Sequence, residues 1–314
     1  METLNQEFCL ACESIISPYD RFCPECTVPI KKLTDSPFRL SMGRWLALGL
    51  ILSFTPAFIL GMFGEWMSIY VANAVLIACA LWVIRRRKIF VTVLIGKLPS
   101  GFNWWLIILM AVAMIPYAVG ATAVIWVPIT KLSPELAEQI FPSGNQLHGV
   151  HLLIVAVVLA PLVEEIIFRG LLFSRMVIKW GVTRAMVVSS LAFGLLHLDP
   201  IGAFVFGIVA CVLYMKTRSL LVPMILHAIY NFVVWSFTFV EAGTDIPNTS
   251  PEYLYQFAYV GLASVILASP VIFFLLGKWW PSRRDSLPYD ANYSLSCNGN
   301  LSEVQSDAIQ PRLM

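Results

Sequence analysis

The chain has 314 residues, of which 58% are hydrophobic and only 13% are Asp, Glu, Lys or Arg. Soluble globular domains carry about a quarter charged residues, so this composition excludes an ordinary soluble protein. The formal net charge of +2 gives no reason to expect a nucleic-acid partner. These values predict an integral, multi-pass membrane protein.

Residues 1–40 are polar, and we predict that they form a cytosolic zinc ribbon and linker. Two CxxC pairs separated by ten residues supply four thiolates, from Cys9, Cys12, Cys23 and Cys26. Four thiolates complete a tetrahedral zinc shell, and the metal would supply folding energy that so short a segment lacks. Two disulfides are the alternative, which a cytosolic location disfavours. Because no secretory signal precedes the cysteines, we expect the N-terminus in the cytosol.

Residues 41–280 are predicted to form an all-α membrane domain, a bundle of about eight transmembrane helices. A spanning helix needs about 20 mostly apolar residues, and several runs meet this length without any charged residue. The dipeptide Asp199-Pro200 predicts a tight turn between the fifth and sixth spans, which are short. The predicted spans are 45–63, 66–84, 103–128, 149–168, 185–198, 201–216, 219–240 and 253–277.

The distribution of Lys and Arg predicts that both termini are cytoplasmic. Eight spans with the N-terminus inside leave only Lys131 in an outer loop, and cytoplasmic loops are the ones enriched in Lys and Arg. We expect the chain in a bacterial inner (cell) membrane. Residues 281–314 are rich in Ser, Asn and Asp and are predicted to be a disordered cytosolic tail. The inner basic residues are Lys31, Lys32, Arg39, Arg44, Arg85, Arg86, Arg87, Lys88, Lys97, Arg175, Lys179, Arg184, Lys216, Arg218, Lys278, Arg283 and Arg284.

Three ionisable residues interrupt the fourth predicted span: Glu164, Glu165 and Arg169. Such groups cost about 3 kcal/mol each inside a membrane and therefore suggest function. Glu165 and Arg169 are four residues apart and can form an ion pair along one helix face. Glu164 points to a different face, because successive helix positions differ by about 100°. It needs either a water-filled cavity or a polar group from another helix.

Two further spans carry polar residues. His197 follows Phe193 by four residues at the outer end of the fifth span, where a lone histidine is usually just an interfacial side chain. His227 and Asn231 lie one turn apart on one face of the seventh span. Both can donate hydrogen bonds. For this pair a hydrogen-bonded contact between helices and a functional role both remain open.

Taken together, these residues are suited to hydrolysing a peptide bond. Glu164 would activate water, His197 would share that task or pass the proton to the leaving amine, and His227 and Asn231 would stabilise the oxyanion. No serine or cysteine is placed as an obvious nucleophile, which favours direct attack by water. Two histidines and a glutamate could also bind a catalytic zinc. Because no HExxH is present, we favour a metal-free glutamate mechanism.

The motifs EExxxR (Glu164, Glu165, Arg169), FxxxH (Phe193, His197) and HxxxN (His227, Asn231) occur in that order within about residues 150–240. In this respect the chain resembles the CPBP family, the CAAX proteases and bacteriocin-processing enzymes, also called Abi. The resemblance implies an eight-helix intramembrane endopeptidase whose site lies in a cavity within the membrane. It implies catalytic roles for the four residues named above, and supporting roles for Glu165, Arg169 and Phe193. It also implies a membrane protein or lipidated peptide as the substrate.

Three alternatives to an enzyme are considered. A non-catalytic scaffold or bacteriocin-immunity protein on the same fold would be favoured by loss of Glu164 or His197, but both are present. A transporter would predict internal repeats with broken helices at matched positions, and no such symmetry is evident. A zinc-ribbon adaptor with a passive anchor would not need Glu and His inside its spans.

Overall fold

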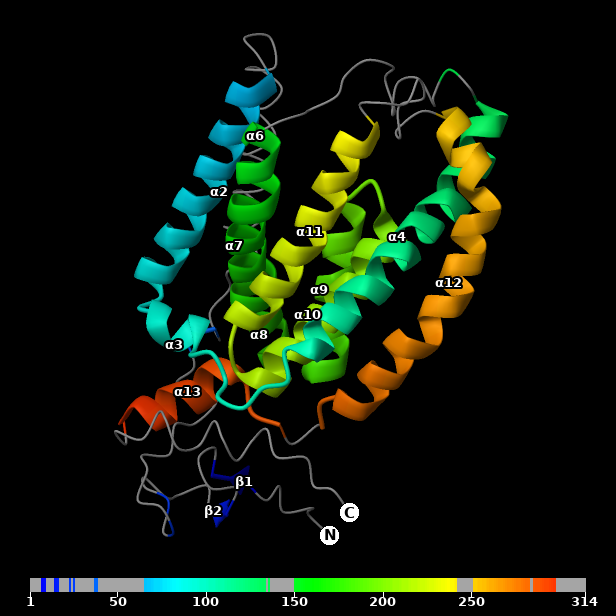
Figure 1. Ribbon diagram of the computed structural model, residues 1–314. Helices are drawn as coiled ribbons and strands as arrows, with labels where there is room; N and C mark the ends of the chain where they lie inside the picture. Colours follow the sequence, from blue (N-terminus) through cyan, green and yellow to red (C-terminus); the bar gives the residue numbers. More distant parts are fainter. Residues whose placement is uncertain are drawn as a thin grey trace.

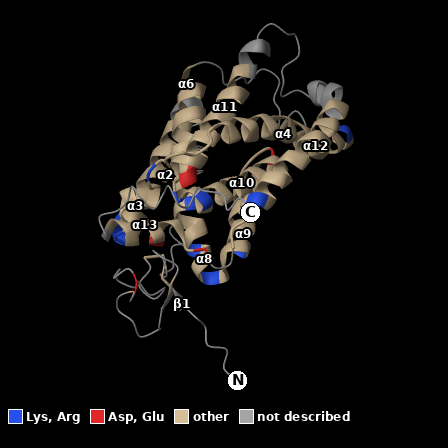
Figure 2. Ribbon diagram, turned by 60° about the horizontal axis from the view of Figure 1, so that its bottom comes forward, with Lys and Arg blue, Asp and Glu red and all other residues tan. Residues whose placement is uncertain are grey.

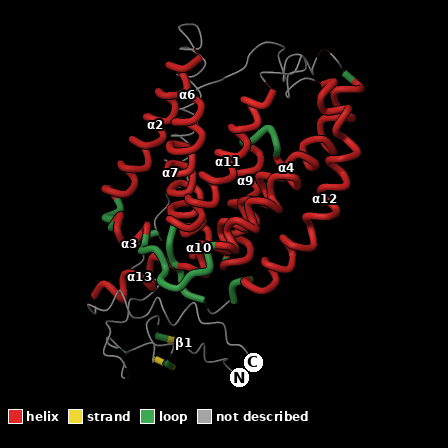
Figure 3. The backbone as a smooth tube through the Cα atoms, in the orientation of Figure 1, coloured by secondary structure: helices red, strands yellow, loops and turns green. Residues whose placement is uncertain are grey.

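The computed structural model describes residues 65–133, 135, 150–241, 251–282 and 285–297, with residues 7–9, 14–16, 23, 25, 37 and 38. The regular secondary structure of these residues is helical apart from one short pair of strands, and loops join the helices. This agrees with the predicted all-α membrane domain (Figures 1 and 3). The helices are α2 (Glu65–Arg86), α3 (Val91–Ile95), α4 (Trp105–Leu132), α6 (Val150–Leu153), η2 (Ile154–Leu159), α7 (Ala160–Glu165), η3 (Ile166–Phe173), α8 (Ser174–Trp180), α9 (Val182–Leu195), α10 (Pro200–Thr217), α11 (Leu221–Glu241), α12 (Pro251–Trp279) and α13 (Pro288–Cys297).

Seven of the eight predicted spans coincide with helices, and the first, 45–63, lies outside the described residues. Within the described part of the chain, five helices are long and apolar enough to cross a membrane. Shorter apolar helices cover Val182–Leu195 and Leu221–Ser236. The chain is therefore an integral membrane protein, whereas the figure of eight crossings remains a prediction.

The predicted boundaries of the fourth span, 149–168, are wrong. Five consecutive segments from α6 to α8 form one uninterrupted apolar helix of 31 residues, Val150–Trp180. Arg175 and Lys179, expected in an inner loop, lie in its last two turns. Glu164 is consequently the fifteenth of 31 residues, near the middle of the helix and not at its end. The prediction ended the span one residue before Arg169, which is in fact buried and paired inside the protein.

Helices α4 and α12 lie along one side of the bundle, while α2 and the 31-residue helix form the other (Figure 1). Gly120 in α4 and Gly261 in α12 meet where the two backbones cross. A Cβ on Gly120 would collide with the carbonyl oxygen of Gly261. Small residues at such crossings allow membrane helices to approach closely. The crossing fixes α4, which contacts the turn that carries His197.

Helices α9 and α10 form a short hairpin, and its turn is the predicted one. Asp199 caps the N-terminus of α10, accepting a hydrogen bond from the backbone N–H of Gly202 at 2.9 Å. With 14 residues at 1.5 Å each, α9 rises only about 21 Å, less than the ~30 Å hydrocarbon core. The turn therefore ends below the tips of the longer helices.

Part of the predicted disordered tail is ordered, because residues Pro288–Cys297 form α13. Tyr289 and Leu295 of this helix are buried, and Tyr289 packs edge-to-face against the buried Phe38. The Asn292 side chain donates to the backbone carbonyls of Val93 and Arg218 at 3.0 and 2.8 Å. The Ser- and Asn-rich composition suggested a tail, but Asn292 bonds to backbone groups of the bundle, and Ser294 and Ser296 bond to carbonyls of α13 itself.

Near the N-terminus, β1 (Glu7–Phe8) and β2 (Ile15–Ile16) pair in antiparallel fashion. The backbone N–H of Cys9 donates to the carbonyl of Ser14 at 2.8 Å, which closes the hairpin around the first CxxC pair. Cys9 and Cys23 are both buried, and the Cys23 thiol lies 3.1 Å from the Ser14 hydroxyl. Cys12 and Cys26 lie outside the described residues.

Candidate active site

Glu164 and Glu165 lie on α7, a single α-helical stretch between two π-helical segments, η2 and η3. Proline explains the first of these segments. The Pro161 ring would clash with a carbonyl one turn earlier, and proline has no N–H to donate. The helix widens there, and the N–H of Ala160 bonds to Val155, five residues back. Such π-helical turns are frequent at functional sites.

Asn231 completes the hydrogen bonding of this widened turn. The carbonyl of Ala156 receives no N–H from Ala160, which bonds to Val155, and none from Pro161, which has none. The Nδ2 group of Asn231 on α11 donates to that carbonyl at 2.7 Å. The contact between helices considered for Asn231 is therefore present. It uses one of the two N–H bonds of the amide and leaves the other for a ligand.

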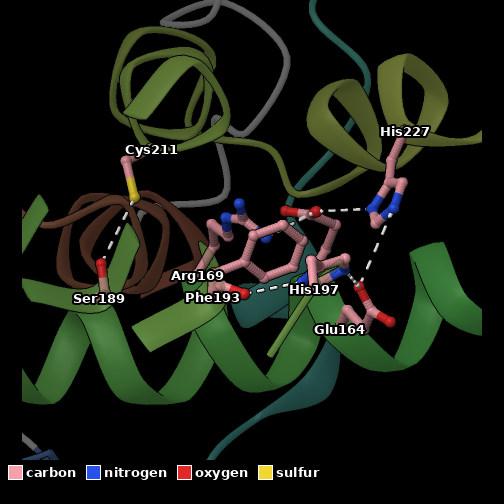
Figure 4. Close-up of polar contacts among 8 residues, drawn as sticks. Glu164, Arg169, Ser189, Phe193, His197, Cys211 and His227 are labelled. Carbon is pink, nitrogen blue, oxygen red and sulfur yellow. Dashed lines mark hydrogen bonds and ion pairs between the residues drawn. The ribbon is translucent and has the colours of Figure 1, made fainter. Parts of the chain in front are cut away.

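Glu164 faces two histidines from other elements (Figure 4). Its Oε2 atom lies 3.8 Å from Nε2 of His197 and 3.9 Å from Nε2 of His227. The side chains of Glu164 and His197 are 26% and 34% exposed, while that of His227 is 6% exposed. Two of the three groups can thus be reached from outside the protein. The polar partners that Glu164 needs come from α11 and from the turn after α9.

Glu165 points to the protein interior, where its carboxylate contacts the guanidinium of Arg169 and the imidazole of His227. Its Oε1 atom accepts from a guanidinium nitrogen of Arg169 at 2.8 Å, which confirms the predicted ion pair. The same atom lies 3.0 Å from Nδ1 of His227. Glu165 and Arg169 are almost completely buried. The two adjacent carboxylates therefore approach opposite nitrogens of one imidazole ring.

Aromatic rings enclose this centre. The Phe193 ring stacks on that of His197 with 4.3 Å between centroids, and the Arg169 guanidinium lies 4.3 Å above the same Phe193 ring. Phe206 on α10 lies 4.8 Å from the His227 ring. Both phenylalanines are buried. They hold the two imidazoles and the guanidinium in fixed planes.

Hydrogen bonds determine which nitrogen each histidine presents. Nδ1 of His197 lies 2.7 Å from the carbonyl of Phe193, and a carbonyl can only accept. Nδ1 of His227 faces the Glu165 carboxylate, which also accepts when ionised. Each ring therefore uses Nδ1–H for support and presents Nε2 to Glu164. Two imidazole nitrogens and one carboxylate oxygen converge, an arrangement suited to holding a water molecule and moving its protons.

Asp199 lies two residues after His197 and has no role in the sequence-based prediction. It sits in the turn between the helices, where burial raises the pKa of its carboxyl from 3.8 to about 6, partly offset by hydrogen bonds from Gly202 and Thr122. Sequence alone identified it only as a turn residue. The pattern Asp-Pro-x-Gly could have identified the helix cap, but not the burial.

The structure thus brings six of the seven predicted catalytic and supporting residues, all except Asn231, into contact around His227 and Glu164. Asn231 is one helical turn from His227 and contacts the widened turn before Glu164. Phe206 and Trp126, which contact the site and its turn, were not predicted, because an aromatic residue in an apolar helix carries no distinguishing pattern. Among the described residues, no group of three His, Cys, Asp or Glu side chains is spaced to hold a metal ion.

Comparisons with known proteins point to the same part of the chain. Residues 146–233 match the family model described as Type II CAAX prenyl endopeptidase Rce1-like. The "Putative membrane peptidase YdiL" of Bacillus subtilis (strain 168) is 33% identical over 87 residues, 26% of this chain and 36% of that protein. An "Uncharacterized 24.3 kDa protein" of Escherichia coli is 29% identical over 128 residues, 36% of this chain and 59% of that protein.

The chain thus covers between about a third and three fifths of the length of these curated relatives. No solved structure matches it. All three motifs lie inside the matched residues, and so does the whole Glu164–His197–His227 centre. The matches support a peptidase of the CAAX-type membrane family, to which residues 146–233 are similar.

Proposed function

We propose that this chain is an intramembrane endopeptidase of CPBP type that hydrolyses a peptide bond of a membrane-presented protein or lipidated peptide. The observation that carries the proposal is the convergence of His197 Nε2 and His227 Nε2 on one oxygen of Glu164, at 3.8 and 3.9 Å. These separations exceed a hydrogen bond, and Oε2 of Glu164 is buried without a hydrogen-bond partner among the described residues, which leaves it able to accept from a water molecule. The resemblance of residues 146–233 to CAAX-type endopeptidases supports the same reaction.

In the proposed reaction Glu164 removes a proton from water as the water oxygen attacks the scissile carbonyl carbon. Electrons of the carbonyl move onto its oxygen. Asn231 donates to that oxyanion, and His227 donates from Nε2 when both of its ring nitrogens carry hydrogen. The tetrahedral intermediate then collapses, the C–N bond breaks, and the leaving nitrogen takes the proton that Glu164 removed from water, either directly or relayed through Nε2 of His197. The products are a carboxylate and an amine. Glu165 and Arg169 position His227, and Phe193 positions His197.

A catalytic zinc is the second candidate, because two histidines and a glutamate converge with their Nδ1 atoms bonded to second partners, as zinc-bound histidines usually are. Zinc–ligand bonds of 2.0–2.1 Å would bring neighbouring tetrahedral ligands to about 3.3 Å from one another. The observed separations of 3.8 and 3.9 Å are wider. We therefore propose the metal-free reaction. Cleavage assays with a zinc chelator distinguish it from the zinc-dependent one.

The test is cleavage of a panel of lipidated reporter peptides by the detergent-purified full chain. We expect Glu164→Gln to lower kcat by at least about 100-fold, the usual contribution of a general base. Glu135→Gln makes the same change at an exposed position and should leave the rate unchanged. Wild-type cleavage that survives a zinc chelator supports the glutamate mechanism, and loss on chelation supports zinc. Unreduced cleavage by the Glu164 variant would refute the site.

We also propose that the N-terminal segment binds a structural zinc ion through Cys9, Cys12, Cys23 and Cys26. The buried Cys9 and Cys23, and the hairpin that brackets the first CxxC pair, support this proposal. Metal analysis of the purified chain should find about one zinc per chain, and Cys23→Ser should lose it. Cys79→Ser, in α2, is the matched control and should retain it. Purified wild type without zinc would refute this proposal.

A further inference from the structure

His197 depends on a non-helical turn for its position. Leu196, His197, Leu198 and Asp199 connect α9 to α10 outside any helix. The N–H of His197 bonds back to the Gly194 carbonyl at 3.0 Å. Asp199 bonds forward into α10, which secures the far side of the turn. Close to the hydrocarbon layer, the remaining backbone polar groups need partners as well.

A tryptophan on α4 supplies one such partner. Nε1 of Trp126 donates to the carbonyl of Leu198, the residue after His197, at 2.6 Å. Thr122 lies one turn earlier on the same face of α4, where its hydroxyl donates to the Ala118 carbonyl at 2.9 Å and lies near enough to the Asp199 carboxylate to lower its pKa. The turn itself is compact, since a Cβ on Gly194 would collide with the Pro200 carbonyl. Helix α4 therefore holds both residues that follow His197.

We propose that Trp126 is a positioning residue, which holds His197 with its Nε2 atom toward Glu164 by anchoring the Leu198 carbonyl. The indole N–H donates to the Leu198 carbonyl, so its influence on His197 passes through the turn. The expected effect of Trp126 on kcat rests on the proposed peptidase function. Its expected effect on the position of the His197 ring does not depend on activity.

The substitution that tests it is Trp126→Phe, which removes the N–H donor and keeps an aromatic ring. Misplacing a catalytic group by about 1 Å can lower the rate 100-fold, so we expect kcat to fall about 10- to 100-fold with KM unchanged. Trp105→Phe is the matched control on the same helix, because Trp105 is 76% exposed and far from the turn. It should change neither constant.

A double variant separates positioning from direct contact. If Trp126 acts through His197, Trp126→Phe should not lower the residual rate of a His197→Ala enzyme any further. A reduction by the same factor in both backgrounds would overturn the inference. So would a change confined to KM, which would indicate contact with the substrate.

A measurement without substrate distinguishes failure of this inference from failure of the proposed function. The rate at which diethyl pyrocarbonate modifies His197, read by mass spectrometry, should rise in Trp126→Phe and not in Trp105→Phe. A rise in a protein that cleaves none of the reporter peptides would leave the positioning role standing and count against the peptidase. An unchanged modification rate together with an unchanged kcat would overturn the role of Trp126.

Discussion

At the scale of single residues, two adjacent glutamates have opposite surroundings. Glu164 is a quarter exposed and faces two imidazole nitrogens, whereas Glu165 is buried against Arg169 and His227. Their helix spacing predicted different faces and the Glu165–Arg169 pair. It could not predict that His227 lies between them, since that contact joins residues 62 positions apart. The proposed supporting role of Glu165 is therefore to orient His227.

Paired substitutions at Glu165 and Arg169 test that role. Glu165→Gln with Arg169→Met removes both charges but keeps an oxygen that can accept from Nδ1 of His227. Glu165→Leu with Arg169→Met removes the acceptor too. If Glu165 orients His227, the first enzyme should retain a kcat about 5- to 13-fold above the second, since a buried hydrogen bond contributes about 1 to 1.5 kcal/mol. Equal rates would show that only the ion pair matters.

Asp199 makes folding stability depend on pH. Because its pKa in the folded chain is about 6, above its ordinary 3.8, ionisation is harder in the folded state. Stability is therefore highest below pH 4 as far as this group is concerned, and falls as the pH rises to about 6. Asn keeps the helix cap without the charge. Asp199→Asn should therefore raise the thermal unfolding temperature at pH 7.5. The gain in the free energy of unfolding should be at most about 3 kcal/mol.

The same variant should match the wild type near pH 3, below both pKa values, where Asp199 is mostly protonated in both folded and unfolded chains. Thermal unfolding in detergent at the two pH values measures the difference. Asp285→Asn, at an exposed position, is the control and should show no such pH dependence. An Asp199→Asn protein that is less stable than the wild type at pH 7.5 would contradict the burial argument.

At the scale of helices, sequence located the apolar segments well and their ends poorly. The α9–α10 turn followed from Asp199 and Pro200, and seven predicted spans coincide with helices. The long helix of α6 to α8 was cut short one residue before Arg169. Helix α13 was missed because Asn292 is polar, and its bonds to Val93 and Arg218 depend on tertiary packing. The composition of a segment indicates whether it faces lipid, but it does not predict hydrogen bonds to distant backbone groups such as those of Asn292.

The crossing of α4 and α12 makes a prediction at this scale. Gly120→Ala forces a methyl group against the Gly261 backbone, so the two helices must separate. We expect a loss of about 1 to 3 kcal/mol in stability, the usual cost of overpacking. Gly277→Ala on α12 is the matched control, because its methyl group would meet no atom within 4 Å. Thermal unfolding of both variants measures the difference, and equal unfolding temperatures would refute the close crossing.

At the scale of the whole molecule, charge is segregated to one end. Lys and Arg gather at the end where α3, α8 and α13 lie (Figure 2). The residues there include the run from Arg85 to Lys88 at the end of α2, Lys179 in α8 and Lys216 in α10. The positive-inside rule assigns this end to the cytoplasm. The ordered α13 belongs to the same end, which is consistent with the predicted cytoplasmic C-terminus.

Fusions to the full chain test this orientation. A green fluorescent protein at the C-terminus should fluoresce in a bacterial host, and alkaline phosphatase at the same position should be inactive, because each folds on only one side of the membrane. The opposite pattern would reverse the orientation.

The widened turn at Pro161 has a consequence for how this helix tolerates insertion and deletion. A π-helical turn contains one residue more than an α-helical turn, so η2 sets the rotational phase of every residue that follows it. Deleting one residue from η2 would remove the extra residue and let the segment close into α-helical turns. Because the widened turn absorbs that residue, α7 would keep roughly its present rotational phase, and Glu164 would still face the two histidines. The deletion would instead close the widened turn beside the Ala156 carbonyl, to which Asn231 donates. A deletion in this segment should therefore displace Asn231 before it displaces Glu164.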